Sequence, residues 1–257
     1  MPRNILIVGA TRGLGASLTT LYADDPSTTV YATARSSAPD DSPENVRWVS
    51  NLDIADPDAG PEITQAWASP DPVDICIITA GYFGLESFDK PDFEAEVQMY
   101  KTSAIGPVFV VQALAKAGLL KEGSKVILVS SESGSITLRH ESEGGGNYAH
   151  HGSKAALNMV GKLLSLDLKD KAIAVGLVHP GFMRTQMTKG VGFDKFWDKG
   201  GAVTPNEAAD SLKRWIEKFD ISKTGQYWAP RGPADIGTAE HVLGPKEHLP
   251  TPLQLPW

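Results

Sequence analysis

The chain has 257 residues, of which 41% are hydrophobic and 21% charged, a balance typical of a soluble globular protein. Its formal net charge of −7 is spread out, with no basic run, so we expect no nucleic acid as a partner. No apolar stretch approaches the ~20 residues that cross a bilayer, so we expect no membrane either. Met1-Pro2-Arg3-Asn4 leads directly into a first strand with no signal peptide, and the single cysteine, Cys76, excludes an internal disulfide. We therefore expect a cytoplasmic protein, without a metal site.

Short β-branched runs alternate with longer helical segments along the chain. We expect strands at residues 5–8, 28–34, 46–49, 73–79, 125–130, 173–178 and 226–229. We expect helices at residues 13–24, 56–68, 149–169 and 207–219, and one or two helices within 92–118. This alternation predicts parallel strands with right-handed crossovers, and continuously apolar strands predict helices on both faces. The sequence therefore predicts one Rossmann-type α/β domain over residues 1–257. Its doubly wound parallel sheet of about seven strands should bind ligands beyond the strands' carboxyl ends.

The first strand runs into a glycine-rich loop and then a helix. Glycines there let backbone amides approach a pyrophosphate at the helix N-terminus, where the dipole favours negative charge. The loop residues expected to hold a dinucleotide are Gly9, Thr11, Arg12, Gly13, Leu14 and Gly15.

The end of the second strand predicts which dinucleotide binds. NADH binders carry a carboxylate there, whereas this chain has Ala34 followed by Arg35. Arg12, in the glycine-rich loop, lies close to the ribose whose 2′ position distinguishes the two dinucleotides in this fold. Two guanidinium groups and no carboxylate suit a 2′-phosphate, so the sequence predicts NADPH.

The loop spacing G-x-x-x-G-x-G resembles the short-chain dehydrogenase/reductase family, and the resemblance covers essentially the whole chain. It implies that Asp53, with Ile54 beside it, contacts adenine. Thr79-Ala80-Gly81 is similar to the family's N-N-A-G, with Ile78 and Thr79 replacing the asparagines and Ala80 and Gly81 kept to admit the ribose. A segment similar to the family's P-G-x-x-x-T implies that the nicotinamide is held by Pro180, Gly181, Met183 and Thr185.

The family's catalytic set is an asparagine, a serine, a tyrosine and a lysine, the last two spaced Y-x-x-x-K. The resemblance implies that Ser131 bonds the developing oxyanion and that Lys154 holds the nicotinamide ribose. Four residues before Lys154, on the same helix face, stands His150 in place of the tyrosine. Tyr148 is the alternative source of a phenol, because the glycine run before it could leave it free of the helix. The asparagine position holds Ser103.

His150 decides which reaction we expect. A neutral imidazole releases its proton poorly, and Lys154 should keep it neutral, so carbonyl reduction should be slow at pH 7 and favoured by lower pH. The leading hypothesis is NADPH-dependent reduction of a ketone, aldehyde or imine. One alternative is a non-redox isomerase, dehydratase or cyclase, and another is a cofactor-sensing protein without catalysis. An engineered substitution at residue 150 is a further alternative. His151 is expected to be exposed, and His179 to pack at a strand end.

Aromatic residues gather in 186–204, which the resemblance implies is a mobile lid over the substrate. Met187, Phe193, Phe196 and Trp197 there favour an apolar or ring-bearing substrate of medium size. The proline-rich tail ends in Pro256-Trp257, like C-factor-like carbonyl reductases, and is expected near the substrate mouth. The helices expected at 92–118 and 149–169 resemble the family's dimer faces, so we expect a homodimer or homotetramer.

Overall fold

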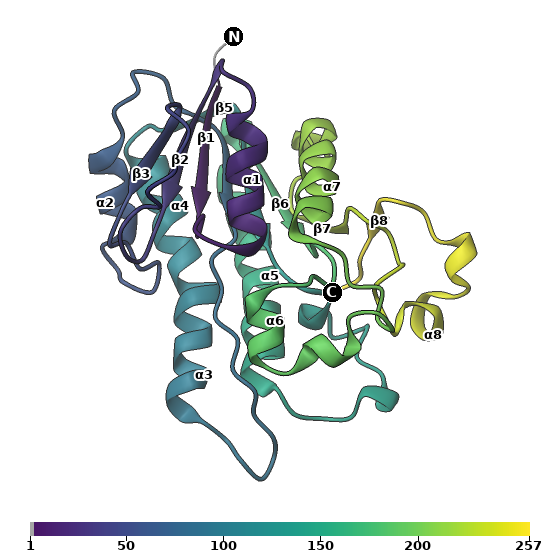
Figure 1. The fold of residues 1–257 in the computed structure, drawn as a ribbon. Coiled ribbons are helices and arrows are strands. Elements are labelled where there is room, and N and C mark those ends of the chain that lie inside the picture. The colour runs from purple at the N-terminus through teal and green to yellow at the C-terminus, as the bar shows by residue number, and fades with distance from the viewer. Residues whose placement is uncertain (1–2) are drawn as a thin grey trace.

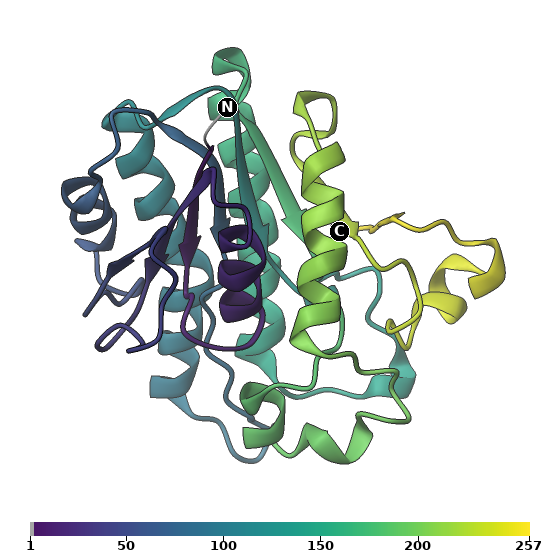
Figure 2. The same ribbon diagram turned by 45° about the horizontal axis from the view of Figure 1, so that its top comes forward.

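The computed structural model describes residues 3–257, which form an eight-stranded sheet between two layers of helices (Figures 1 and 2). The strand order is β3-β2-β1-β4-β5-β6-β7-β8. The strands are β1 (Arg3–Val8), β2 (Thr28–Thr33), β3 (Val46–Val49), β4 (Val73–Ile78), β5 (Leu120–Val129), β6 (Ala174–Val178), β7 (Gln226–Ala229) and β8 (Leu253–Gln254). The first seven are parallel, which confirms the doubly wound prediction. Met1 and Pro2, expected to lead into the first strand, lie outside the described residues.

The eighth strand is a difference from the expected seven. β8 pairs antiparallel with β7 through Trp228↔Gln254 and Ala229↔Leu253. It has two residues and comes from the proline-rich tail, so no alternation of apolar and polar residues marks it in the sequence. It extends the sheet edge and brings the tail alongside β7.

The helices cover both faces of the sheet. They are α1 (Gly13–Ala23), α2 (Ala59–Ala66), α3 (Phe93–Tyr100), α4 (Gly106–Lys116), α5 (Tyr148–Leu168), α6 (Gln186–Gly190), α7 (Pro205–Lys218) and α8 (Ala239–Leu243). α1 and α7 pack together on one face, and α2, α4 and α5 cover the other (Figures 1 and 2). Strands buried on both faces explain why their sequences are apolar throughout. Among residues 3–257, no helix is long and apolar enough to span a membrane.

The region expected to hold one or two helices contains a π-helical turn at Lys101–Ile105 that joins α3 to α4. A π turn adds a residue to the helical repeat and so rotates the side chains that follow it. Regular helical spacing therefore does not predict the directions of the side chains in this turn.

Candidate active site

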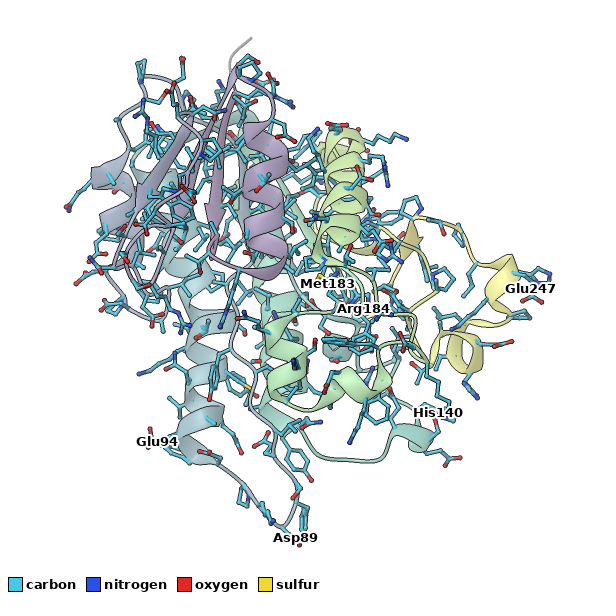
Figure 3. The ribbon with its side chains drawn as sticks, in the orientation of Figure 1. Asp89, Glu94, His140, Met183, Arg184 and Glu247 are labelled. Atoms are coloured by element: carbon cyan, nitrogen blue, oxygen red, sulfur yellow. The ribbon has the colours of Figure 1, made fainter. Side chains whose placement is uncertain are left out.

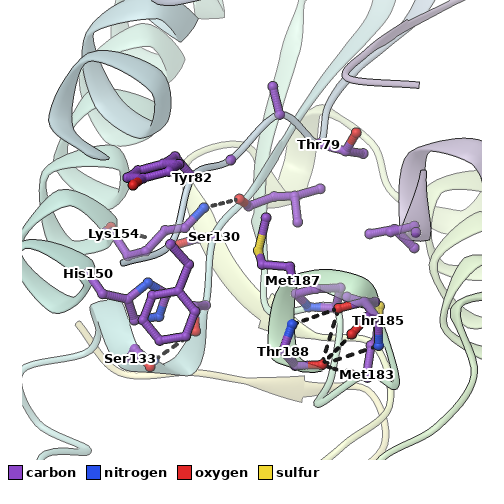
Figure 4. A pocket seen from close by; sticks show the side chains of 18 of the residues that line it. Thr79, Tyr82, Ser130, Ser133, His150, Lys154, Met183, Thr185, Met187 and Thr188 are labelled. Atoms are coloured by element: carbon purple, nitrogen blue, oxygen red, sulfur yellow. Dashed lines mark hydrogen bonds between the residues drawn. The ribbon is translucent and has the colours of Figure 1, made fainter. Parts of the chain in front are cut away.

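One cavity of about 770 Å³ opens beyond the carboxyl ends of the strands and gathers nearly all the predicted site residues (Figure 4). Its lining includes Gly9, Thr11, Arg12, Gly13, Leu14, Gly15, Arg35, Asp53, Ile54, Ala80, Gly81, Ser131, His150, Lys154, Pro180, Gly181, Met183 and Thr185. Tyr148 is not in that lining. The residues come from seven segments of the sequence, which the parallel sheet brings to one edge.

The glycine loop is shaped for close approach of a ligand. Gly9 has φ +91°, and a Cβ there would lie 2.7 Å from the Ala80 Cα. The Thr79 hydroxyl donates to the Gly9 carbonyl at 2.9 Å, so threonine anchors the loop where the family has asparagine. Within the described residues, no side chain caps α1 at Arg12, so the first amides of the helix are free for an anion.

Two exposed arginines flank the expected ribose end of the cavity. Arg12 stands immediately before α1, and Arg35 follows β2 by two residues. Both line the cavity, and Ala34 between β2 and Arg35 is buried. Asp53 also lines the cavity, and its Oδ1 accepts a hydrogen bond from the Ala55 amide at 3.0 Å. The arrangement provides two guanidinium groups for an anionic group near Arg35.

Lys154 is buried, 9% exposed, and its Nζ donates to the Val129 carbonyl at 2.9 Å, which ties the middle of α5 to the end of β5. Ser130 supports the same junction by donating to Asn158 Oδ1 at 2.7 Å. Burial lowers the Lys154 pKa to about 8, because a charged ammonium is poorly solvated there. Lys154 is therefore a cation at neutral pH whose proton is held less tightly than usual.

His150 points into the cavity beside Lys154, as the four-residue spacing predicts (Figure 4). Its ring lies 4.2 Å from the Phe83 ring, centroid to centroid. Burial, followed by the charge of Lys154, lowers the His150 pKa to about 3. Burial therefore lowers the His150 pKa more than the charge of Lys154 does, whereas the sequence indicated Lys154 as the cause. The imidazole is neutral at every ordinary working pH, so the expected advantage of mildly acidic pH does not arise from this group.

Ser131 is held in place from several sides. It has an extended backbone just after β5, and its Oγ accepts from the Ser133 amide at 3.2 Å. Its carbonyl accepts from the Tyr227 hydroxyl, which is contributed by β7. With these groups fixed, the hydroxyl proton of Ser131 remains available for an acceptor in the cavity.

The two other expected catalytic positions lie elsewhere. Tyr148 is the first residue of α5 and its side chain is 47% exposed, so the helix includes it and carries it outside the cavity. The expectation that the glycine run frees it is thus not met. Ser103 is 1% exposed but does not line the cavity, whereas Thr102 does. Both residues belong to the π turn.

Several cavity residues were missed by the sequence reasoning. His151, expected to be exposed, lines the cavity; its Nδ1 lies 2.8 Å from the Asn147 carbonyl and its Nε2 3.2 Å from Arg139 Nη1. Arg139 also pairs with Glu132 and, at 2.9 Å, with Glu143. Tyr82 and Phe83 line the cavity as well. Among these residues, only Tyr82 and Phe83 could have been predicted from the sequence, because they directly follow Ala80-Gly81.

The segment expected to be a lid forms α6 and a short 3₁₀ turn, and Thr185 caps α6 through its side chain. Figure 3 places Met183 and Arg184 between α7 and α6. Met187, Phe193 and Phe196 line the cavity. Trp197 does not, since its indole donates to Thr188 Oγ1 at 3.2 Å. The tail reaches the cavity through Asp235 alone among the described residues.

Comparisons with known proteins agree with this architecture. A family model for short chain dehydrogenases matches residues 3–195. The chain is 30% identical over 155 residues to a 1-hydroxy-2-glutathionyl-2-methyl-3-butene dehydrogenase from Rhodococcus sp. (strain AD45), covering 60% of this chain and 64% of that one. It is 34% identical over 167 residues to C-signal of Myxococcus xanthus, covering 63% and 90%.

A solved structure shares the fold. The NADPH-bound carbonyl reductase from chicken fatty liver superposes with a TM-score of 0.73 at 21% identity, covering 89% of this chain and 96% of that one. The expected resemblance to the short-chain dehydrogenase/reductase family is confirmed by the family model, and C-signal is among the relatives. The chain therefore belongs to the short-chain dehydrogenase/reductase family and is an oxidoreductase of that type.

Proposed function

We propose that this chain is an NADPH-dependent oxidoreductase that reduces a carbonyl or imine group of a medium-sized apolar molecule. One observation carries the proposal. A single cavity joins a glycine loop with two arginines at one end to Ser131, His150 and Lys154 at the other. The chicken carbonyl reductase with the same fold is bound to NADPH.

The described residues fit a phosphorylated dinucleotide. The free amides at the start of α1 suit the pyrophosphate, and Arg12 and Arg35 suit the 2′-phosphate. Asp53 and Ile54 would contact adenine, and Ala80 and Gly81 would admit the ribose. Pro180, Gly181, Met183 and Thr185 would hold the nicotinamide. NADPH, when bound, supplies the hydride.

The chain's own residues would polarise the acceptor and deliver the proton. The Ser131 hydroxyl and one imidazole N–H of His150 donate to the substrate oxygen and stabilise the charge that develops on it. Lys154 holds the ribose, and with a pKa of about 8 it is the protonated group able to pass a proton toward that oxygen. The carbonyl carbon gains hydride, the oxygen gains a proton, and an alcohol leaves.

The lowered pKa of His150 favours this reaction over the non-redox alternatives. An isomerase or dehydratase would need His150 as a base, and a base works best with a pKa near the working pH. A pKa of about 3 makes the imidazole a weak base as well as a neutral donor. Hydrogen-bond donation is the role left to it, and that role suits carbonyl reduction.

The apolar wall of the cavity supports a ring-bearing substrate. Phe83, Phe193 and Phe196 line it, and the Phe83 and Phe193 rings meet edge to face at 5.7 Å. The direct test is NADPH oxidation by purified protein with a panel of aromatic and aliphatic ketones, aldehydes and imines, together with product analysis. We expect the alcohol or amine to form in step with NADPH consumption. Tight NADPH binding without turnover on any substrate, including extract of the host, would favour the sensor.

Replacing both arginines tests the coenzyme assignment. In Arg12→Ala/Arg35→Ala we expect NADPH affinity to fall about 30-fold, because two charge-assisted contacts to the 2′-phosphate are lost. NADH affinity should stay within about threefold, since NADH lacks that phosphate. Equilibrium titration of both coenzymes gives the ratio, and Arg214→Ala on exposed α7 is the matched control. An equal loss for the two coenzymes would contradict the assignment.

An exposed apolar stripe supports the proposal of a homodimer or homotetramer. Met159, Leu163 and Leu166 on α5 are 61%, 53% and 58% exposed, and their spacing places them on one helix face. Phe109 on α4 is also exposed, at 41%. We expect Leu163→Glu to lower the mass measured by light scattering to that of one chain, because a buried unpaired charge opposes association. Lys218→Glu on α7 should leave the mass unchanged. A wild-type protein that is already monomeric would refute this prediction.

We also propose that residues 1–257 act as one NADPH-binding domain in the cytoplasm and that residues 186–204 form a lid. The location is supported by the lone cysteine, Cys76, which is buried in β4. The proposal of a lid is supported by side chains of α6 and the following turn, which line the cavity.

A further inference from the structure

A buried carboxylate of the tail lines the cavity next to the turn that follows β6. Asp235 stands between β7 and α8, and its side chain is 1% exposed. Its Oδ2 accepts a hydrogen bond from the Phe182 amide at 2.8 Å. Gly181 has φ +108°, and a Cβ there would lie 2.5 Å from the same Oδ2. The carboxylate therefore supports the turn Pro180–Met183, which carries the residues proposed to hold the nicotinamide.

A buried histidine connects this carboxylate to the serine loop. His179 directly follows β6, and its side chain is 7% exposed. Its Nδ1 accepts from the Glu132 amide at 3.0 Å, so a neutral ring carries its proton on Nε2. That Nε2 lies 3.9 Å from Asp235 Oδ1. Glu132 is the residue after Ser131, so His179 fixes the backbone next to the proposed oxyanion donor.

Both side chains border the cavity but expose little surface to it, 7% for His179 and 1% for Asp235. Within residues 3–257, Asp235 Oδ1 and His179 Nε2 have no hydrogen-bond partner, and Arg231 Nε stays 3.5 Å from Asp235 Oδ2. A buried carboxylate with one hydrogen bond and one ion pair at 3.5 Å costs stability relative to an apolar side chain of similar size. We therefore expect the benefit of Asp235 and His179 to lie in ordering the two loops that they contact, the loop 180–183 and the loop of Ser131.

We propose that Asp235 and His179 are positioning residues through which the C-terminal tail sets the geometry of the active site. Asp235 holds the nicotinamide loop, 180–183, and His179 holds the loop of Ser131. The inference rests on the proposed function for its catalytic consequence. The contact of Asp235 with loop 180–183 can be tested without cofactor or substrate.

Asp235 is tested by removing its acceptor and then restoring it. In Asp235→Ala we expect faster amide exchange in segment 180–183 and NADPH affinity about tenfold weaker, because the Phe182 amide loses its partner. Asp235→Asn keeps an oxygen in place and should stay within about threefold of wild type. Asp210→Ala, which breaks an exposed pair with Arg214 on α7, is the matched control. If Asp235→Ala does not fold, Asp235→Ser takes its place, since its hydroxyl stops about one bond short of Oδ2.

His179 is tested by the same logic with a different readout. In His179→Leu we expect kcat to fall about tenfold with NADPH affinity nearly unchanged, because the Ser131 loop loses its anchor. His179→Asn, whose side-chain oxygen can replace Nδ1 as acceptor, should restore most of kcat. Wild-type exchange in segment 180–183 of Asp235→Ala would overturn the proposal. That readout needs no coenzyme, so it separates failure of this inference from failure of the proposed function.

Discussion

Replacing His150 with tyrosine is expected to raise kcat/KM for ketone reduction about 100-fold at pH 7. The wild-type imidazole has a pKa of about 3 and so stays neutral, which leaves it a hydrogen-bond donor that cannot serve as an acid. A phenol at the same place on α5 would lie beside Lys154, whose positive charge stabilises a phenolate and makes proton release easier. Steady-state NADPH oxidation with a ketone substrate measures the effect.

Two further variants make the result specific. His150→Phe should lose about tenfold relative to wild type, since it donates no hydrogen bond to the substrate oxygen. His248→Tyr, a substitution at an exposed histidine of the tail, should leave the rate unchanged. A loss of the natural product in His150→Tyr would instead point to chemistry that requires imidazole. Identical rates for wild type, His150→Tyr and His150→Phe would remove residue 150 from the mechanism.

Lys154→Met is expected to lower kcat/KM about 1000-fold and to weaken NADPH binding as well. Methionine keeps much of the buried stem but lacks the ammonium that we propose holds the ribose and supplies the proton. Lys162→Met, on an exposed face of the same helix, should leave both quantities unchanged. Unchanged NADPH affinity in Lys154→Met would contradict the ribose contact.

The same lysine sets the expected pH dependence. Burial lowers its pKa to about 8, so the ammonium is present below that pH and lost above it. We expect the rate of reduction to fall as the pH rises through about 8. No change is expected near pH 6.5, because His150 does not titrate there. A rate that rises as the pH falls through 6.5 would contradict a neutral His150.

The cofactor end could be predicted from sequence because its signals are local. Gly9 and Gly15 are needed where one short loop meets Ala80 and Thr79, and the spacing alone indicates that turn. The four-residue spacing likewise places His150 and Lys154 on one face of α5. The positions of β3 and β7 followed from short apolar runs with clear ends.

The rest depends on contacts between distant segments. The π turn at Lys101–Ile105 leaves no trace in the apolar spacing. Phe83, which packs on the His150 ring, comes from the segment after β4, so the depth of the pKa shift could not be read from residues near 150. Asp235, from the segment after β7, lies 3.9 Å from His179, which follows β6. Pairings of this kind are set by tertiary packing, which local patterns do not encode.

Isothermal titration of the purified protein with NADPH and with NADH measures the coenzyme preference on which the proposed function depends. We expect both to bind, with NADPH at least about tenfold tighter because Arg12 and Arg35 contact its 2′-phosphate. Equal affinities, or no heat with either coenzyme, would contradict it.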